Sequence, residues 1–152
     1  MTTFSSAADA LRFLTGSNAT VTLDFEATGR HFTLKIAKPW NRDDNCRDHD
    51  AKIFFVNELT GDPNDDDFRN FVGFFFADTK KLMQSKKARA AGTPPCDAFK
   101  ALAWVMRQLS ADVLPEGVAI HHSDHCCRCG RTITHPDSLA RGIGPECIKH
   151  FS

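Results

Sequence analysis

The sequence predicts an α+β fold: an antiparallel sheet of about four strands with one or two covering helices, followed by a C-terminal treble-clef-like zinc finger. Several segments of the N-terminal part alternate apolar and polar side chains, as half-buried strands do. Two other segments repeat apolar residues at helical spacing. The C-terminal stretch carries cysteines at metal-ligand spacing. We therefore expect a sheet domain over residues 1–120 and a zinc finger over residues 121–152.

Length and composition agree with this division. A chain of 152 residues suits one compact domain with a small module appended. Apolar residues make up 41% of the chain, and its aromatic residues include 13 Phe and no Tyr. Because Phe has no hydroxyl group that needs a partner, it suits a dry interior. The sequence therefore predicts a sizeable apolar core.

The N-terminal segment predicts a helix followed by a β-hairpin. Ser5-Ser6 offers an N-cap for a helix over Ala7–Thr15, which carries Leu and Phe among good helix formers. Residues 20–26 and residues 31–38 alternate apolar and polar side chains, and Gly29 lies in the turn between them. We expect the helix to lie on the sheet that this hairpin begins.

The middle of the chain predicts two more strands, over Lys52–Leu59 and Phe68–Ala77, after a polar loop over Trp40–Asp50. The run of Phe in the later strand is apolar on both faces. It therefore indicates either a strand covered on two sides or a sheet with one exposed apolar face. A helix is expected from Pro95 to about Ser110, and a short strand over Val118–Ile120.

The C-terminal stretch predicts a zinc site. Cys126 and Cys129 are spaced so that one tight turn brings both sulfurs to one ion, and Gly130 allows the turn that follows. A short helix starting at Pro145 would direct Cys147 and His150 towards that turn. Paired cysteines at this spacing in a reduced cytosol are typical of zinc rather than of a disulfide.

The fourth ligand is less determined by the sequence than the three cysteines are. His150 is favoured by its spacing from Cys147, which is typical of two ligands on one helical turn. The alternatives are His125, His122 and His135. Cys127 lies inside the turn and should point away from the ion.

The stretch from Cys126 to Cys147 resembles the C-terminal signature of an uncharacterised bacteriophage and mobile-element family, roughly C-x-x-C-G-R-x-L-T-x-P-x-S-x-x-x-G-x-G-P-x-C. The one departure is Ile133, where Leu is usual. Segments in the N-terminal half, among them Thr28–Ile36 and Leu59–Asp62, are similar to that family's strand motifs. The resemblance implies a phage or prophage origin and a zinc finger, and it brings no established activity. The matching positions are Arg131, Thr134, Pro136, Ser138, Gly142, Gly144, Pro145 and Cys147.

Charge is separated along the chain although the formal net charge is zero. Residues 41–67 carry nine acidic and three basic side chains, whereas residues 79–107 carry seven basic and one acidic. The basic stretch could follow a phosphate backbone, and the acidic one could dock on a basic protein surface. Two solvated loops are the simpler alternative. The candidate nucleic-acid-binding residues are Lys80, Lys81, Lys86, Lys87, Arg89 and, in the finger, Arg131.

Taken together, these patterns favour a zinc-binding, non-enzymatic phage accessory protein that binds nucleic acid through the basic segment and the finger. The alternative is a protein-binding inhibitor of a host enzyme or anti-phage defence complex, acting through the acidic loops and the Phe-rich sheet. No nucleotide-binding or nucleophile motif is present in the sequence. No apolar run approaches the roughly 20 residues that span a bilayer, so no membrane partner and a cytoplasmic location in the bacterial host are expected.

Overall fold

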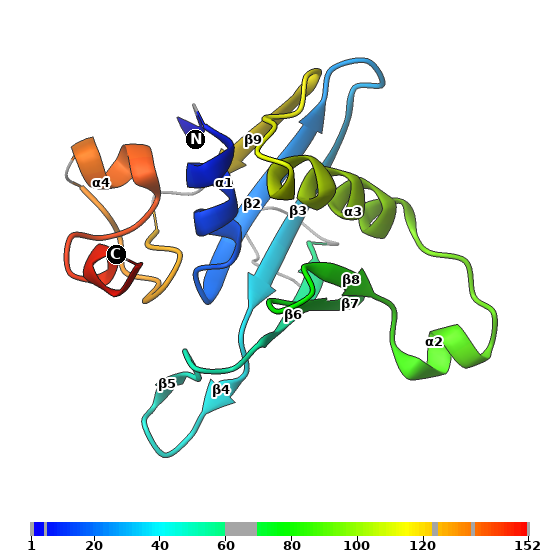
Figure 1. The fold of residues 1–152 in the computed structure, drawn as a ribbon, viewed down its shortest axis with the longest axis horizontal. Helices are drawn as coiled ribbons and strands as arrows, with labels where there is room; N and C mark the ends of the chain where they lie inside the picture. Colours follow the sequence, from blue (N-terminus) through cyan, green and yellow to red (C-terminus); the bar gives the residue numbers. More distant parts are fainter. Residues whose placement is uncertain (1, 5, 60–69, 123–124, 135, 152) are drawn as a thin grey trace.

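A computed structural model of the chain describes residues 2–4, 6–59, 70–122, 125–134 and 136–151, and the fold is α+β (Figure 1). Its described elements, in chain order, are β1 (Thr2–Thr3), α1 (Ala7–Leu14), β2 (Asn18–Phe25), β3 (Arg30–Ala37), β4 (Trp40–Asn41), β5 (Cys46–Arg47), β6 (Ile53–Glu58), β7 (Asn70–Phe76), β8 (Lys81–Met83), α2 (Lys86–Ala90), α3 (Asp97–Ser110), β9 (Val118–His122), α4 (Pro136–Arg141) and a 3₁₀ helix, η2 (Cys147–Phe151).

The main sheet is antiparallel throughout and has the strand order β1-β9-β2-β3-β6-β7-β8 within the described residues. The predicted hairpin is confirmed, because β2 pairs with β3 along its whole length, from Asn18 opposite Ala37 to Phe25 opposite Arg30. The prediction of about four strands was wrong. Within the described residues this sheet has seven strands: the predicted short strand over Val118–Ile120 is confirmed as β9 and pairs with β2, and the short strands β1 and β8 add to the two edges.

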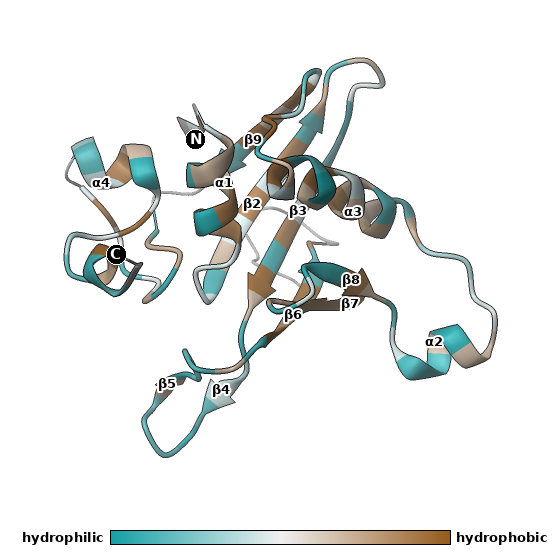
Figure 2. Cartoon of the chain, viewed as in Figure 1, coloured by the Kyte–Doolittle hydropathy of each residue, from teal (hydrophilic) through white to brown (hydrophobic). Residues whose placement is uncertain are grey.

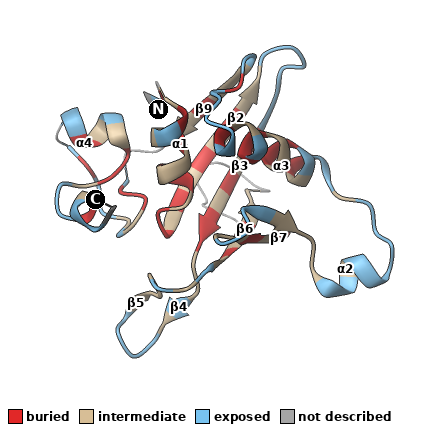
Figure 3. Cartoon of the chain, in the orientation of Figure 1, coloured by how far each residue is buried: buried red, intermediate tan, exposed pale blue. Residues whose placement is uncertain are grey.

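Two helices cover one face of this sheet (Figure 1). Ser6 caps α1, because its side chain accepts a hydrogen bond from the backbone N–H of Asp9 at 3.2 Å. The buried side of α1 includes Phe13 and Leu14, and that of α3 includes Leu102 and five other apolar residues. Their side chains and the inward face of β2, β3, β6 and β7 form one buried cluster, coloured red in Figure 3.

The opposite face of β6 and β7 carries Phe side chains that are only half-buried or exposed. A bulge causes this arrangement: Val56 pairs with Gly73 but Asn57 pairs with Phe71, so β7 contains one extra residue. The extra residue reverses the alternation, and Phe71 therefore lies on the same face as Phe74, with ring centroids 5.0 Å apart. Of the two alternatives that the sequence left open for β7, the described structure shows one covered face and one exposed apolar face.

The stretch over Trp40–Asp50 was predicted as a loop, and the structure corrects this. A two-stranded ribbon forms there, with Trp40 opposite Arg47 and Asn41 opposite Cys46. Asn41 stabilises the turn because its side-chain oxygen accepts a hydrogen bond from the backbone N–H of Asp43 at 3.0 Å. Strands of two residues are too short to show a period in the sequence, so this ribbon left no alternation to detect.

The C-terminal segment packs on the sheet domain and shares its core. Cys126, Cys127, Ile133 and Ile143 belong to the same buried cluster as the side chains of α1 and β2. The fold thus joins the two predicted parts through one apolar interior, and the division at residue 120 stays a prediction. Hydrophobic residues occur along the strands of the sheet and also within the C-terminal segment (Figure 2). Among the helices that the structure describes, none is long and apolar enough to cross a membrane.

Candidate metal centre

A tight turn places the first two cysteines. The backbone N–H of Gly130 donates to the carbonyl of Cys126 at 2.9 Å, and the N–H of Cys126 donates to the carbonyl of Arg131 at 2.8 Å. Gly130 has a φ of +79°, which a residue with a side chain rarely adopts. Outside the turn, His125 and Thr132 form an isolated antiparallel bridge. The short hairpin thus directs Cys126 and Cys129 to one side, as the sequence predicted.

The third cysteine comes from the chain end. Cys147 is the first residue of η2, and the N–H of Ile148 donates to the carbonyl of Gly144 at 3.0 Å, which closes the preceding turn. The predicted helix from Pro145 is thus present as a 3₁₀ helix that begins two residues later. Cys147 is buried, whereas His150 on the same helix is exposed.

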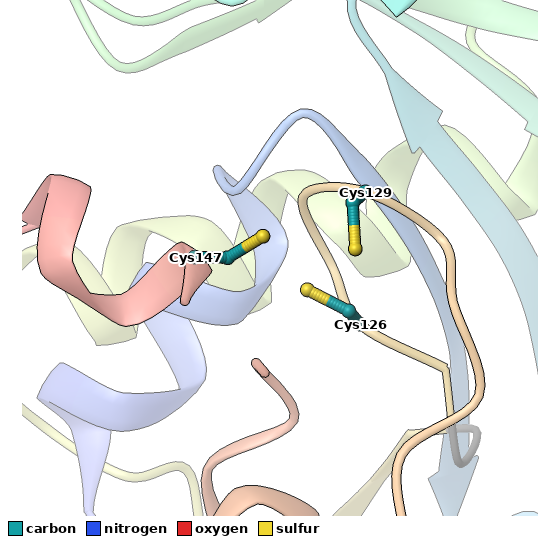
Figure 4. Close-up of side chains that lie close together, drawn as sticks. All are labelled: Cys126, Cys129 and Cys147. Carbon is teal, nitrogen blue, oxygen red and sulfur yellow. The ribbon is translucent and has the colours of Figure 1, made fainter. Parts of the chain in front are cut away.

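The three thiols converge on one point (Figure 4). The sulfur atoms of Cys126, Cys129 and Cys147 all lie within 4.8 Å of one another. A tetrahedral ion with metal–sulfur bonds of about 2.3 Å needs sulfurs about 3.8 Å apart. The observed spacing is therefore at most about 1 Å wider than a bound metal requires. All six cysteines are free thiols, so no disulfide competes for these sulfurs.

Hydrogen bonds from the backbone prepare Cys126 to be a thiolate. Its sulfur accepts the N–H groups of Arg128 at 3.4 Å and Gly144 at 3.3 Å. Burial by itself raises the pKa of Cys126, but these N–H groups and that of Cys129 outweigh burial and lower the pKa below its ordinary value. Donors that converge on one sulfur favour the anionic form, which is the metal ligand.

The pKa of Cys147 reflects the crowding of the three thiols. Burial, the Cys129 side chain and the charge of Cys126 raise the pKa of Cys147 to about 11. A divalent cation reverses this effect, because a coordinating thiol is deprotonated outright. Arg128 contributes positive charge on the same side, with its guanidinium 4.0 Å from the Cys147 sulfur. Crowding of the three thiols thus disfavours a second thiolate unless a cation is bound, and their spacing could hold a metal ion.

Cys127 points away from the cluster, as predicted, and holds the turn against the sheet domain. Its side chain is 1% exposed and contacts the backbone position of Gly16, where a Cβ would collide with the sulfur. Burial raises the pKa of this thiol far above its ordinary value. Its carbonyl accepts the N–H of Asn18 at 2.6 Å, and its N–H donates to Gly142 at 2.9 Å. Cys127 thus connects β2, the metal turn and the end of α4.

The candidate fourth ligands lie in different places. His125 is exposed beside the turn, and His122 is buried in β9 with its ring 4.6 Å from that of Phe4. His135 lies outside the described residues. Within the described chain, no histidine or carboxylate ligand atom lies within 4.8 Å of all three sulfurs. His150 as the fourth ligand therefore stays a prediction.

The candidate nucleic-acid-binding residues lie in three places: at β8, on α2 and in the C-terminal module, and the last two are at opposite ends of the molecule (Figure 1). Lys80 precedes β8 and Lys81 begins it, whereas Lys86, Lys87 and Arg89 lie on α2. Arg131 lies instead in the C-terminal module, next to the metal turn. All six side chains are exposed, and none of them forms an ion pair with an acidic residue that the structure describes.

Sequence reasoning missed α4 and the residues that attach it. Gly142, with a φ of +72°, ends the helix, and the following Ile143 is fully buried. A signal was present, because Pro136 at the start and Gly142 after the end are the residues preferred at those two positions. The contact of this segment with α1 left no local signal, because it depends on where the sheet places α1.

Comparison with known proteins adds one finding. Residues 120–152 match the family model described as "Family of unknown function (DUF6011)". The matched span contains the three clustered cysteines and ends with η2. No curated protein and no solved structure matches the chain.

Proposed function

We propose that the C-terminal module binds one zinc ion through Cys126, Cys129 and Cys147 and that the chain is a non-enzymatic, nucleic-acid-binding protein of phage or prophage origin. The observation that carries the zinc proposal is the convergence of three thiols within 4.8 Å, one of which accepts backbone N–H bonds. Thiolate ligands favour zinc over hard cations such as Mg²⁺ and Ca²⁺. In this proposal the turn, the hairpin and the ligand-bearing helix form a treble-clef-like finger, and zinc would contribute on the order of 10 kcal/mol to its folding.

The nucleic-acid proposal rests on the basic arm, which we define as residues 80–95. The helix within it, α2, has no buried residue and projects from the sheet (Figure 3). Its side chains therefore add nothing to the core, yet the arm carries five exposed cations, two at β8 and three on α2. Gln84 donates to the carbonyl of Thr93 at 3.1 Å, which joins the two segments that flank α2. A structured projection with one sign of charge is suited to phosphate contacts.

Metal analysis tests the zinc proposal. Protein purified without chelator should contain one zinc ion per chain by elemental analysis. Cys129→Ser should lose most of that zinc, because serine supplies a harder and less acidic ligand than the thiol. Cys96→Ser is the matched control, since Cys96 is an exposed thiol outside the cluster. Zinc content that is equal in the two variants would contradict the ligand assignment.

Salt dependence tests the nucleic-acid proposal. If all five cations of the arm contact phosphates, the affinity for duplex DNA should fall about 500-fold between about 50 and about 200 mM salt. Changing Lys86, Lys87 and Arg89 to Glu should abolish binding in fluorescence anisotropy. The control changes Arg42, Lys100 and Arg107, which are exposed cations elsewhere. It alters the net charge equally and should retain most of the affinity. Equal losses in both variants would mean that only net charge matters and would reject the arm as the site.

A second candidate function, inhibition of a host enzyme or defence complex, is favoured by the exposed apolar face. Phe71 is 41% exposed and stacks edge to face on Phe74, which in turn contacts Phe55. Exposed aromatic clusters of this kind are typical of protein interfaces. If DNA and RNA both fail to bind at low salt, this candidate takes precedence. It predicts that Phe71→Ser loses a host protein that the unmodified chain captures, while Phe32→Ser, a core change, unfolds the chain instead.

A further inference from the structure

The three clustered thiols open into a cavity. Its volume is about 470 Å³, and Cys126, Cys129 and Cys147 all line it. The rest of its wall comes from the two segments that flank the thiols: Arg131, Thr132, Ile133, Thr134, Gly144, Pro145 and Glu146. One water molecule occupies about 30 Å³ of liquid volume. The cavity therefore has more than ten times the space that a single metal-bound water needs, and it reaches the size of small-ligand sites.

A metal ion held by the three cysteines has one further tetrahedral position. Structural zinc sites fill it with a fourth protein ligand, whereas ligand-binding and catalytic sites leave it for water or another small molecule. The backbone N–H groups of Arg128 and Gly144 occupy part of the surroundings of the Cys126 sulfur. The open space beside all three thiols is the cavity that they line. We propose that the fourth position faces this cavity and binds an exchangeable external ligand, an inference that rests on the proposed zinc site.

The cavity wall indicates the chemistry of that ligand. Zinc bound by three thiolates prefers another soft donor, such as a thiolate. Arg131 brings an exposed guanidinium to the wall, and the hydroxyl groups of Thr132 and Thr134 lie on the same segment. The acidic member of the wall, Glu146, forms an exposed ion pair with Lys149 at 3.3 Å, so two basic side chains, Arg131 and Lys149, stand against one acidic side chain there. The ligand is therefore a small thiol that carries a carboxylate: the sulfur binds the metal, and the carboxylate pairs with Arg131.

The experiment uses the full-length chain with cobalt in place of zinc, because the visible bands of Co²⁺ report its donor atoms. Mercaptoacetate is the probe, and 2-mercaptoethanol and acetate each present one half of it. Mercaptoacetate should shift the bands saturably and bind about tenfold more tightly than 2-mercaptoethanol, and acetate should leave the bands unchanged. Arg131→Ala should remove that tenfold preference, and the control Arg107→Ala on α3 should keep it.

Two results would overturn the inference. Bands that do not move at saturating thiol show a closed site. Bands that change when His125, His135 or His150 is replaced by Ala show that the chain itself supplies the fourth ligand. Because Arg131 is exposed, its replacement leaves the core intact, and the comparison of thiols on the unmodified chain needs no variant. Metal content measured on the same samples separates the two proposals. If each chain holds one metal but its visible bands do not shift with added thiol, the metal site is supported and the exchangeable fourth position is rejected.

Discussion

Gly142 lies where the C-terminal module crosses α1, and it is the residue whose replacement should do most damage there. A Cβ at this position would collide with the Phe13 ring and come within 3.3 Å of the His122 ring. The left-handed φ of +72° adds strain for any other residue. Gly142→Ala should therefore lower the free energy of unfolding, measured with urea at saturating zinc, by about 3 kcal/mol or more.

Gly29→Ala is the matched control for that variant. Its φ of +68° is nearly the same, but nothing lies within 4 Å of the added methyl group. Gly29→Ala should therefore lower the free energy of unfolding only through backbone strain, by about 1 kcal/mol. Equal losses for the two alanines would mean that the module is not packed against Phe13 as the structure has it.

His49 should give the stability of the chain a pH dependence. Its Nδ1 is 2.8 Å from the hydroxyl of Ser17, and its carbonyl accepts a hydrogen bond from Lys38 at 2.6 Å. Burial is the main cause that lowers its pKa below 6.5; the charges of Arg128, Lys38 and His150 add to this, and Asp50 opposes it. Below pH 6.5 the unfolded chain therefore binds more protons than the folded one, and the free energy of unfolding falls as the pH drops through that window.

Urea unfolding at about pH 7.5 and about pH 5.5, with zinc saturating at both, measures this effect. His49→Gln removes the titrating group and keeps a polar side chain, so its stability should fall less between the two values than that of the unmodified chain. An identical fall in both proteins would assign the pH dependence to other groups.

Most of the elements that the sequence predicted are long enough to show a period. α1, β2, β3, β6 and α3 each span six or more residues, and their buried positions follow the expected spacing. β7 was predicted from its apolar run although its bulge interrupts the alternation, and β9 was predicted as a short strand. The six-residue α4 was missed. The missed strands β1, β4, β5 and β8 have two or three residues, so no alternation could identify them. α2 has five residues and only one local signal, Ser85, whose side chain accepts the N–H of Ala88 at 3.1 Å.

Some features of the candidate site could likewise be predicted from the sequence, and others could not. The spacing of Cys126, Cys129 and Cys147 predicted the thiol cluster, because ligands from two tight turns need only local geometry. The role of Cys127 as a buried anchor to Asn18 could not be predicted, because it depends on a contact between segments far apart in the sequence. Which histidine could serve as the fourth ligand also depends on contacts between segments far apart in the sequence.

The basic arm should be separable from the fold. α2 has no buried residue, and the hydrogen bond between Gln84 and Thr93 already brings together the two segments that flank it. Replacing residues 86–92 by two glycines should therefore change the free energy of unfolding by no more than about 0.5 kcal/mol. Leu82→Ala on the adjacent β8 removes a side chain packed against the core and should cost at least about 1 kcal/mol. A large loss on excising α2 would show that the arm supports the fold and weaken its assignment as a binding surface.

At the scale of the whole molecule, the shared core decides what metal removal does. Ile143 and Cys127 pack in the same cluster as Phe13 and Leu14, so loss of the module exposes the buried side of α1. Chelation should therefore lower the stability of the sheet as well as that of the C-terminal segment. We expect one cooperative thermal transition before and after chelation, with a midpoint lowered by about 10 °C or more.

Trp104 provides the probe for this prediction. It lies on α3 with its ring 6.3 Å from Phe25, far along the sheet from the metal turn, and Trp40→Phe removes the other, exposed tryptophan. Chelation should move the Trp104 transition together with the loss of helical circular dichroism, and added Zn²⁺, but not Ca²⁺, should restore both. A Trp104 transition that stays in place while the C-terminus loses its structure would mean that residues 1–120 fold alone. In that case the contacts of Cys127 and Ile143 would add little to the stability of the sheet, and the metal would stabilise only the segment that binds it.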